Sequence, residues 1–431
     1  MNKLMVKLRT VTPLFLTGAE IAEINGEAET RVSSFKGAMR FWYRAIDGDY
    51  RQNENGIFGG TGKSEGQAAF LMQIKDLITG KETWHRKKYD LLTDKGSRQN
   101  GINYLGYSLD LGDRKRKFIP VGKDIEVSLA FKKEINDKEK INVALRHKAV
   151  LAAWWLLSHV GGLGSRSRRG FGTLAFQEWL VVEGEKWAEL EELPFAHGAK
   201  TPEEWLKIFQ TGLETLKKWF PKEIKKDHTV LAAGSRFFLF KEGFPKGRIK
   251  NQDIEFEGWE LALNEAGKIL QAFRNRWKLD DHSTDYHIVK AHLAKVYGRS
   301  IVDPRPALLA RCPERVAFGL PLTFRYNSLK EQVGVKKDGK PKYEVPEVAF
   351  EGEIHNRSAS PLFVRIVQIN DKYHPFFALL KAPLLSSGEK IKARAKTKKE
   401  NECFLEPADS NILTRFCDQE LKPKSLPEVI L

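Results

Sequence analysis

The chain reads Gly161-Gly162-Leu163-Gly164-Ser165-Arg166-Ser167-Arg168-Arg169-Gly170-Phe171-Gly172 between an apolar run and a strand-like run. These twelve residues hold five glycines and three arginines. Glycine lacks a Cβ, so it adopts positive φ and lets backbone N–H groups converge on an anion. Arginine grips phosphate oxygens through two parallel N–H groups. The stretch therefore predicts a loop that holds phosphates, with a tight solvated turn as the alternative.

The two flanks of this loop predict its setting. Residues 143–160 are apolar almost all round, which is typical of a buried helix. Residues 173–182 have the composition and alternation of a strand. The loop is therefore expected to join a helix to a strand at the edge or groove of a sheet.

The charge balance of the whole chain favours a polyanionic partner. The 72 Lys and Arg residues exceed the 56 Asp and Glu residues, so the formal net charge is +16. At 41% hydrophobic residues over 431 positions, the chain can build cores for two domains or more. It has no apolar run of transmembrane length and no signal-peptide pattern at its start, which argues against a membrane partner. Cys312, Cys403 and Cys417 lack metal-like spacing and are interpreted as reduced thiols of a cytoplasmic protein.

A second basic motif lies near the start of the chain. Residues 31–45 have helical periodicity, and Ser33 or Ser34 is expected to cap the helix. Lys36, Arg40 and Arg44 follow one another at spacings of four, so they form one stripe along the helix. The stripe fits phosphate binding, and an ordinary solvated helix face fits it equally well.

A nucleoside triphosphate site is excluded by spacing. Gly62-Lys63-Ser64 has the ending of a P-loop, but Ile57 stands where that motif requires its first glycine. The remaining segments alternate between strand and helix patterns. Strands are expected at 4–15, 103–111, 125–131, 235–240, 360–367 and 373–380, and helices at 202–220, 259–277 and 285–297. Six Lys and Arg residues between Lys390 and Lys399 fit either a basic strand or a surface loop.

The ordered set of motifs resembles the RAMP proteins of CRISPR effector complexes, and more narrowly the family of the first RAMP subunit of the type III-B Cmr complex. The motifs are Thr12-Pro13-Leu14, Arg31-x-x-Ser34-x-Lys36-Gly37-x-x-Arg40-Phe41-Trp42-x-Arg44-Ala45, Ile57-Phe58-Gly59, the stretch from Gly161 to Gly172, Gly319-Leu320-Pro321-Leu322, and Arg357-Ser358-Ala359-Ser360-Pro361-Leu362.

This resemblance implies an α+β fold with two ferredoxin-like, RRM-related domains, each an antiparallel sheet with helices on one face. The first domain is expected at 1–220 with its glycine-rich loop at 161–172, and the second at 221–431. The resemblance also implies contact with guide RNA toward its 3′ end and with the target RNA paired to it. The expected RNA-binding residues are Arg31, Ser34, Lys36, Arg40, Arg44, Gly162, Gly164, Ser165, Arg166, Arg168 and Arg169.

Catalysis is the main rival hypothesis, because relatives in this superfamily cut RNA. His147 and His159 stand near the glycine-rich loop and are the candidates for acid–base chemistry. The loop after the first strand offers Glu20, Glu23, Glu27 and Glu29 but has no aspartate, which is the residue that cutting relatives use there. His282, His287 and His292 recur every five residues, a spacing that does not place three metal ligands on one helical face.

The sequence therefore predicts a cytoplasmic, non-catalytic RNA-binding subunit of a type III-B CRISPR ribonucleoprotein. It is expected to need no cofactor and no metal, and to assemble with guide RNA, target RNA and other RAMP subunits of the Cmr complex. An RNA-cutting RAMP and a purely structural scaffold subunit are the alternatives.

Overall fold

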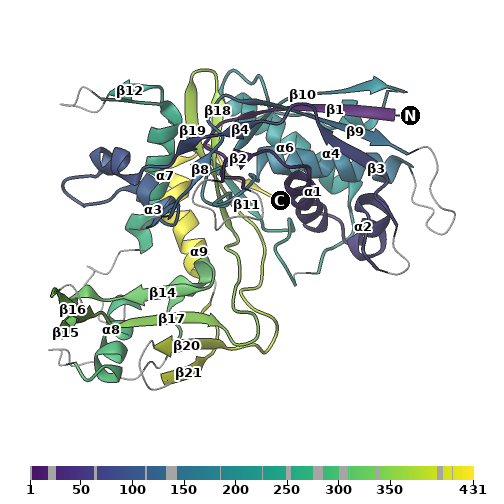
Figure 1. Cartoon of the computed structure of the whole chain (residues 1–431). Coiled ribbons are helices and arrows are strands. Elements are labelled where there is room, and N and C mark those ends of the chain that lie inside the picture. The colour runs from purple at the N-terminus through teal and green to yellow at the C-terminus, as the bar shows by residue number, and fades with distance from the viewer. Residues whose placement is uncertain are drawn as a thin grey trace. The chain divides into compact units, whose positions relative to one another are not determined.

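The computed structural model describes residues 2–17, 26–62, 66–111, 114–132, 143–184, 186–225, 227–248, 254–274, 285–299, 309, 311–335, 339–395, 401–409 and 411–431 (Figure 1). Its contacts divide the chain into two compact units. Unit 1 comprises Met1–Gln271, Leu362–Lys381 and Leu421–Leu431, and unit 2 comprises Ala272–Pro361 and Ala382–Glu420.

Unit 1 begins with a four-stranded sheet in the order β10-β1-β9-β3, in which all neighbouring strands are antiparallel. In chain order its elements are β1 (Asn2–Thr10), α1 (Val32–Arg44), β3 (Phe70–Ile74), β9 (Asp124–Phe131), α4 (Val143–His159) and β10 (Leu174–Glu183). This βαββαβ order, with the last strand beside the first, is the ferredoxin-like arrangement. The short helix α2 (Tyr50–Phe58) follows α1.

A second antiparallel sheet in unit 1 has the order β18-β19-β11-β22. Its elements are β11 (Arg236–Leu239), α7 (Gly258–Arg274), β18 (Leu362–Ile369), β19 (Lys372–Leu379) and β22 (Val429–Ile430). Taken in chain order, its strands repeat the arrangement of the first sheet. The helix that precedes β22, α9 (Asn411–Phe416), clusters with unit 2.

One continuous core joins both sheets of unit 1. Alternation in β1 buries Leu4, Val6 and Leu8 completely, because successive side chains of a strand point to opposite faces. The apolar helix α4 is buried along nearly its whole length, as its composition predicts. Helix α6 (Pro202–Trp219), proposed from the sequence as a connector, also belongs to this core, where Phe209 packs edge-on against Phe237 of β11.

Unit 2 is built on the antiparallel sheet β14-β17-β20-β21. Its elements are α8 (Asp285–Val296), β14 (Leu322–Arg325), β15 (Glu331–Val335), β16 (Pro341–Glu344), β17 (Glu347–Gly352), β20 (Ile391–Ala395) and β21 (Asn401–Leu405). Helix α8 shares a core with the sheet, where Leu293 and Phe350 are both fully buried. The two motifs that characterise the second half meet here, because the N–H of Leu320 donates to the carbonyl of Ser358 at 2.8 Å.

The remaining elements are short. They are β2 (Ala28–Glu29), β4 (Thr79–Gly80), β5 (Glu82–Thr83), η1 (Arg86–Leu92), α3 (Gly101–Leu105), β6 (Asp110–Leu111), β7 (Arg114–Lys115), β8 (Lys117–Phe118), α5 (Glu189–Glu192), β12 (Gly247–Arg248), β13 (Glu255–Phe256), η2 (Glu314–Phe318), η3 (Asn327–Leu329), η4 (Cys417–Leu421) and η5 (Lys422–Lys424). Those between β3 and β9 form the β3–β9 segment, residues 75–123.

Two local expectations are wrong. The N-cap of α1 is Arg31, with φ −134° and ψ 130°, and no side chain caps the helix; Ser33 and Ser34 lie within its first turn. Residues 103–111 contain the end of helix α3 and only two strand residues. The helix forms because Asn100 accepts a hydrogen bond from the N–H of Asn103 at 3.0 Å, which is an N-cap interaction.

The expected domain boundary after residue 220 separates the two sheets of unit 1 and does not coincide with the division into compact units. The sequence of unit 2 forms two segments within that of unit 1, one that begins near the end of α7 and one that follows β19. The division into domains at 1–220 and 221–431 stays a prediction.

Candidate nucleic-acid interface

The glycine-rich loop, residues 161–172, follows α4 directly, and its glycines are required by close packing. A Cβ on Gly161 would lie 2.5 Å from Nε1 of Trp42, and one on Gly164 would lie 2.4 Å from the carbonyl oxygen of Phe15. Gly164 and Gly172 also have positive φ values of 80° and 64°. The glycines therefore allow the loop to pack tightly against α1 and the segment that follows β1.

Some N–H groups of the loop donate backbone hydrogen bonds, and others do not. Leu163 donates to the carbonyl of Gly172, and Ser165 donates to the carbonyl of Phe15, both at 2.9 Å. Within the part of the chain that the structure describes, the N–H groups of Gly162 and Gly164 have no hydrogen-bond partner. Both glycines line a hollow, and N–H groups without a partner at a hollow are candidate donors to an anion.

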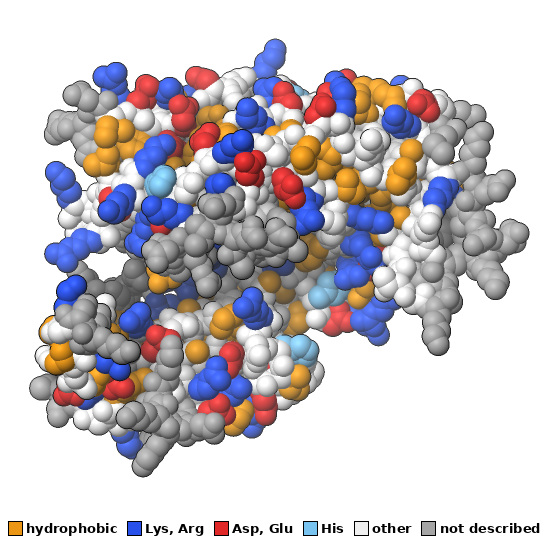
Figure 2. Space-filling view, in the orientation of Figure 1, with side chains coloured by type: hydrophobic (Ala, Val, Ile, Leu, Met, Phe, Trp, Pro, Cys, Tyr) orange, Lys and Arg blue, Asp and Glu red, His pale blue; other side chains and the backbone are white. Residues whose placement is uncertain are grey.

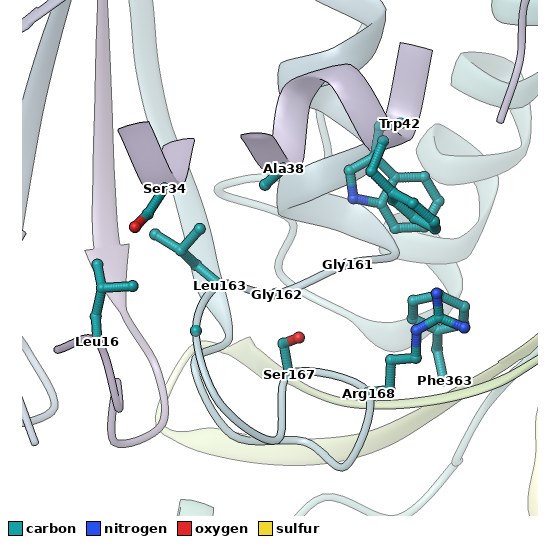
Figure 3. Close-up of a pocket in the computed structure, with 12 residues that line it drawn as sticks. Leu16, Ser34, Ala38, Trp42, Gly161, Gly162, Leu163, Ser167, Arg168 and Phe363 are labelled. Atoms are coloured by element: carbon teal, nitrogen blue, oxygen red, sulfur yellow. The ribbon is translucent and has the colours of Figure 1, made fainter. Parts of the chain in front are cut away.

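This hollow, which we call the loop hollow, has a volume of about 340 Å³ (Figure 3). The first turns of α1 lie on one side, the glycine-rich loop on the other, and Phe363 of β18 beneath (Figure 3). Its lining residues are Leu16, Ser34, Ala38, Phe41, Trp42, Gly161, Gly162, Leu163, Gly164, Ser167, Arg168 and Phe363. Two hydroxyl groups and one guanidinium thus reach the same hollow as the glycine N–H groups.

Arg168 is held at the hollow by aromatic rings. Its guanidinium carbon lies 4.5 Å from the centre of the Phe363 ring and 5.2 Å from that of Phe41, which are cation–π distances. The backbone carbonyl of Arg168 accepts a hydrogen bond from the N–H of Val364 at 3.1 Å. Burial lowers the pKa of Arg168 to about 10, so the side chain still carries its charge at neutral pH.

A second arginine, Arg365, holds both ends of the loop by hydrogen bonds. It is not among the residues expected from the sequence. Arg365 of β18 is 3% exposed and donates to the carbonyls of Gly161 at 2.7 Å and Leu174 at 2.5 Å. Burial lowers its pKa to about 9. One arginine inside the apolar run 362–367 was the available signal, because an arginine is almost never fully buried unless it has partners.

The predicted basic stripe of α1 exists, but two of its three cations face a carboxylate. Arg40 and Arg44 both form ion pairs with Glu54 of α2, whose side chain is 7% exposed; Nε of Arg44 lies 2.6 Å from Oε2 of Glu54. Burial alone would raise the pKa of Glu54, but hydrogen bonds from the two arginines lower it overall. In contrast, Lys36 lies over the Phe70 ring at 5.9 Å, and burial lowers its pKa with help from nearby Arg40.

The other expected site residues lie on neighbouring surfaces. Arg31 forms an ion pair with Glu29 at 3.4 Å. Two interactions tie the loop to the β3–β9 segment: Arg166 donates to Oγ of Ser108 at 2.9 Å, and Ser165 accepts from Arg116 at 2.7 Å. The N–H of Arg169 donates to the carbonyl of Arg166 at 2.7 Å. The structure thus brings Ser34, Gly162, Gly164 and Arg168 together in the loop hollow and distributes the remaining candidates around it.

The β3–β9 segment extends the basic character of unit 1. Figure 2 shows lysine and arginine side chains gathered over the region of α3. The described residues of this segment include the exposed cations Lys75, Lys81, Arg86, Lys87, Lys88, Lys95, Arg98, Lys115 and Lys123.

The two histidines named as acid–base candidates are both buried and engaged. Nδ1 of His159 lies 2.9 Å from the carbonyl of Trp155, and its Nε2 accepts the N–H of Ala196 at 3.0 Å. Burial lowers the pKa of His159 to about 3, so it stays neutral at pH 7. His147 stacks on Trp187 at 3.7 Å and faces Glu189 at 3.5 Å, and burial lowers its pKa. Both imidazoles are therefore engaged by neighbouring groups within unit 1.

Several further expectations concern metals, carboxylates and membranes. His287 and His292 lie in α8, His282 lies outside the described residues, and the described part of the chain holds no cluster of three or more metal-binding side chains. Glu20 and Glu23 also lie outside the described residues, while Glu27 pairs with Lys81 at 3.4 Å. Of the helices that the structure describes, none is both long and apolar enough to span a bilayer.

Comparison with known proteins shows what the first part of this chain is similar to. Residues 7–175 match the sequence model of the RAMP superfamily, the region that holds β1, α1, α4 and the glycine-rich loop.

Two curated relatives and one solved structure are similar to this chain. The chain is 26% identical over 195 residues to the CRISPR system Cmr subunit Cmr1-2 of Pyrococcus furiosus, a match that covers 41% of this chain and 96% of the relative. It is 29% identical over 157 residues to Cmr subunit Cmr1-1 of the same organism, covering 34% of this chain and 40% of the relative. The crystal structure of Cmr1 from Pyrococcus furiosus in its apo form has the same fold, with a TM-score of 0.52, 17% identity, and coverage of 100% of this chain and 98% of that one.

Proposed function

We propose that this chain is an RNA-binding subunit of a type III-B CRISPR effector ribonucleoprotein, which contacts guide RNA toward its 3′ end and the target RNA paired with it. The likeness to the Cmr1-2 and Cmr1-1 subunits of the CRISPR system Cmr supports the effector complex. Other RAMP subunits of the Cmr complex are the proposed protein partners, and the cytoplasm is the proposed location.

The loop hollow is the observation that carries the RNA-binding proposal. It offers the N–H groups of Gly162 and Gly164, the hydroxyls of Ser34 and Ser167, and the charge of Arg168. Donors of this kind bind phosphate oxygens irrespective of base sequence, which suits a guide of variable sequence. The net charge of +16 favours approach of the strand at long range.

We further propose that the chain acts without cutting RNA itself. The two histidines that the sequence offers as acid–base candidates, His147 and His159, are buried, and burial lowers the pKa of each. A general acid or base must lie within hydrogen-bond reach of the reacting group, which these two side chains do not.

Salt titration of RNA binding tests the proposal. Binding of the purified full-length chain to single-stranded RNA is measured by fluorescence anisotropy at several salt concentrations. Each neutralised phosphate contributes a slope of about −0.7 to the dependence of log affinity on log salt for single strands. We expect Arg168→Gln to weaken binding and to reduce the slope by about one such contact. Because Arg168 also packs on two rings, Ser167→Asp serves as a second variant that repels phosphate without removing this packing.

Arg248→Gln is the matched control, because it removes one exposed charge outside the loop hollow. The RNA-binding proposal fails if binding by the parent does not weaken with salt, or if both loop variants bind as tightly as the control. Cleavage of single-stranded RNA by the purified chain would overturn the non-catalytic part of the proposal.

A further inference from the structure

The loop hollow is lined by polar and apolar groups. The glycine-rich loop contributes the N–H groups of Gly162 and Gly164 and the hydroxyl of Ser167. Helix α1 contributes the hydroxyl of Ser34 and, further along, the apolar side chains of Ala38 and Phe41, which form an apolar wall. A phosphate interacts with the polar groups only, so the apolar wall leaves space for a different ligand group.

The apolar wall remains accessible from the hollow. Ala38 and Phe41 are half-buried, whereas the lining residues Trp42 and Phe363 are only 2% and 4% exposed. The planar guanidinium of Arg168 lies against the rings of Phe41 and Phe363. Aromatic rings and arginine planes are the surfaces on which proteins stack single RNA bases that have left their own stack.

The size of the hollow restricts its occupant. Its volume of about 340 Å³ is at the lower end of the range of about 300–1,000 Å³ for small-molecule sites. A duplex segment does not enter such a space, but one nucleotide has a suitable size.

The lining residues also determine whether the site distinguishes between nucleobases. None of the lining residues is Asp, Glu, Asn or Gln, and the guanidinium of Arg168 lies over two aromatic rings. The serine hydroxyls can bond to the edge of any base, so they distinguish the bases weakly. A base held here is therefore bound mainly by its face, and all four bases should bind.

We infer that the loop hollow holds one unstacked nucleobase against the wall of Ala38 and Phe41, while the adjoining phosphate binds the glycine N–H groups and the serine hydroxyls. This inference rests on the proposed RNA-binding function and adds a base subsite to it. The ligand is thus a single-stranded nucleotide within the bound RNA, displaced from its neighbours.

The test compares two short ligands on the full-length chain: an oligoribonucleotide and an oligomer of the same length whose residues all lack bases. The parent is expected to prefer the base-carrying ligand. Ala38→Leu fills the hollow from its apolar side and should reduce that preference by about tenfold, the effect of losing one base–aromatic stack. Its affinity for the base-free oligomer should equal that of the parent. The reduction should be similar for oligomers of each of the four bases.

Ser33→Leu is the matched control, because Ser33 is exposed at the start of the same helix, α1, and does not line the hollow. Phe41→Leu is the second variant in case Ala38→Leu fails to fold, and it should also reduce the preference for bases. If both folded variants keep the preference of the parent while RNA binding remains salt-sensitive, the base subsite is wrong and the RNA-binding function stands. If neither ligand binds the parent in a salt-sensitive manner, the proposed function itself fails.

Discussion

At the scale of single residues, close packing determines which positions of the glycine-rich loop must lack a side chain. Gly161 is required by the indole of Trp42 and Gly164 by the carbonyl of Phe15, two groups far away in the sequence. Composition predicts an anion-binding loop but cannot name these neighbours, because they are set by tertiary packing. Arg365 was missed for the same reason, since its partners Gly161 and Leu174 lie about 200 residues earlier.

The burial of His159 predicts how the free energy of unfolding depends on pH. Its pKa falls from an ordinary 6.5 to about 3 through burial, with nearby Arg365 and His197 also lowering it. Between these two pH values the unfolded chain binds a proton that the folded chain does not. Stability is therefore fully present above pH 6.5 and is lost as pH falls toward 3, by up to about 1.4 kcal/mol per pH unit from this group.

Urea unfolding as a function of pH measures this contribution. His159→Gln keeps a donor and an acceptor but does not titrate, so its free energy of unfolding should depend less steeply on pH between 6.5 and 3 than that of the parent. Equal slopes for the parent and the variant would show that His159 titrates normally in the folded chain.

At the scale of elements, sequence periodicity predicts helices and strands correctly where tertiary packing favours the same structure. The expected helix at 31–45 is α1 within one residue at each end, and the expected strand at 125–131 is β9. The expected strand at 103–111 failed because tertiary contacts decide that segment. Asn264 of α7 accepts the N–H groups of Gly101 and Ile102 at 2.9 and 3.1 Å, which caps a helix start that local sequence does not reveal.

The basic stripe of α1 predicts two separable effects. Arg44 fastens α1 to Glu54 of α2, so Arg44→Gln should lower the free energy of unfolding by about 1 kcal/mol, a figure reduced by the partial exposure of Arg44. Lys36 forms no ion pair within the described part of the chain. Lys36→Gln should therefore leave stability within about 0.5 kcal/mol of the parent and weaken RNA binding.

Thermal unfolding and salt-dependent anisotropy on the same two variants separate these effects, with each variant serving as the control for the other. The assignment of roles would be reversed if Arg44→Gln weakened RNA binding without loss of stability, or if Lys36→Gln lost stability without any change in RNA binding.

At the scale of the whole molecule, the sequence motifs identified the class of fold, while the division into domains at 1–220 and 221–431 stays a prediction. The resemblance implied two domains, and the two sheets of unit 1 have the same ferredoxin-like strand order. Unit 2 was not foreseen, because it is assembled from two segments, Ala272–Pro361 and Ala382–Glu420, with the hairpin β18–β19 between them in the sequence. Periodicity within each segment gives no sign that they share one sheet.

Separate cores predict separate unfolding of the two units. Differential scanning calorimetry of the full chain should show two transitions, because units 1 and 2 each bury a core of their own. Phe350→Ala in unit 2 and Phe209→Ala in unit 1 each remove a fully buried ring, at a cost of about 3–5 kcal/mol. Each variant should lower one transition and leave the other in place. A single transition that both substitutions lower equally would mean that the units unfold as one.

The buried guanidinium of Arg365 has a consequence for how this protein could be shortened. A chain that stops at residue 220 would retain every glycine and arginine of the loop at 161–172, but it would lose the cation that holds the carbonyls of Gly161 and Leu174. These buried oxygens would then lack a donor, and the loop would relax. The first sheet can therefore carry the complete signature of an RNA-binding loop and still depend on the second sheet for the shape of that loop.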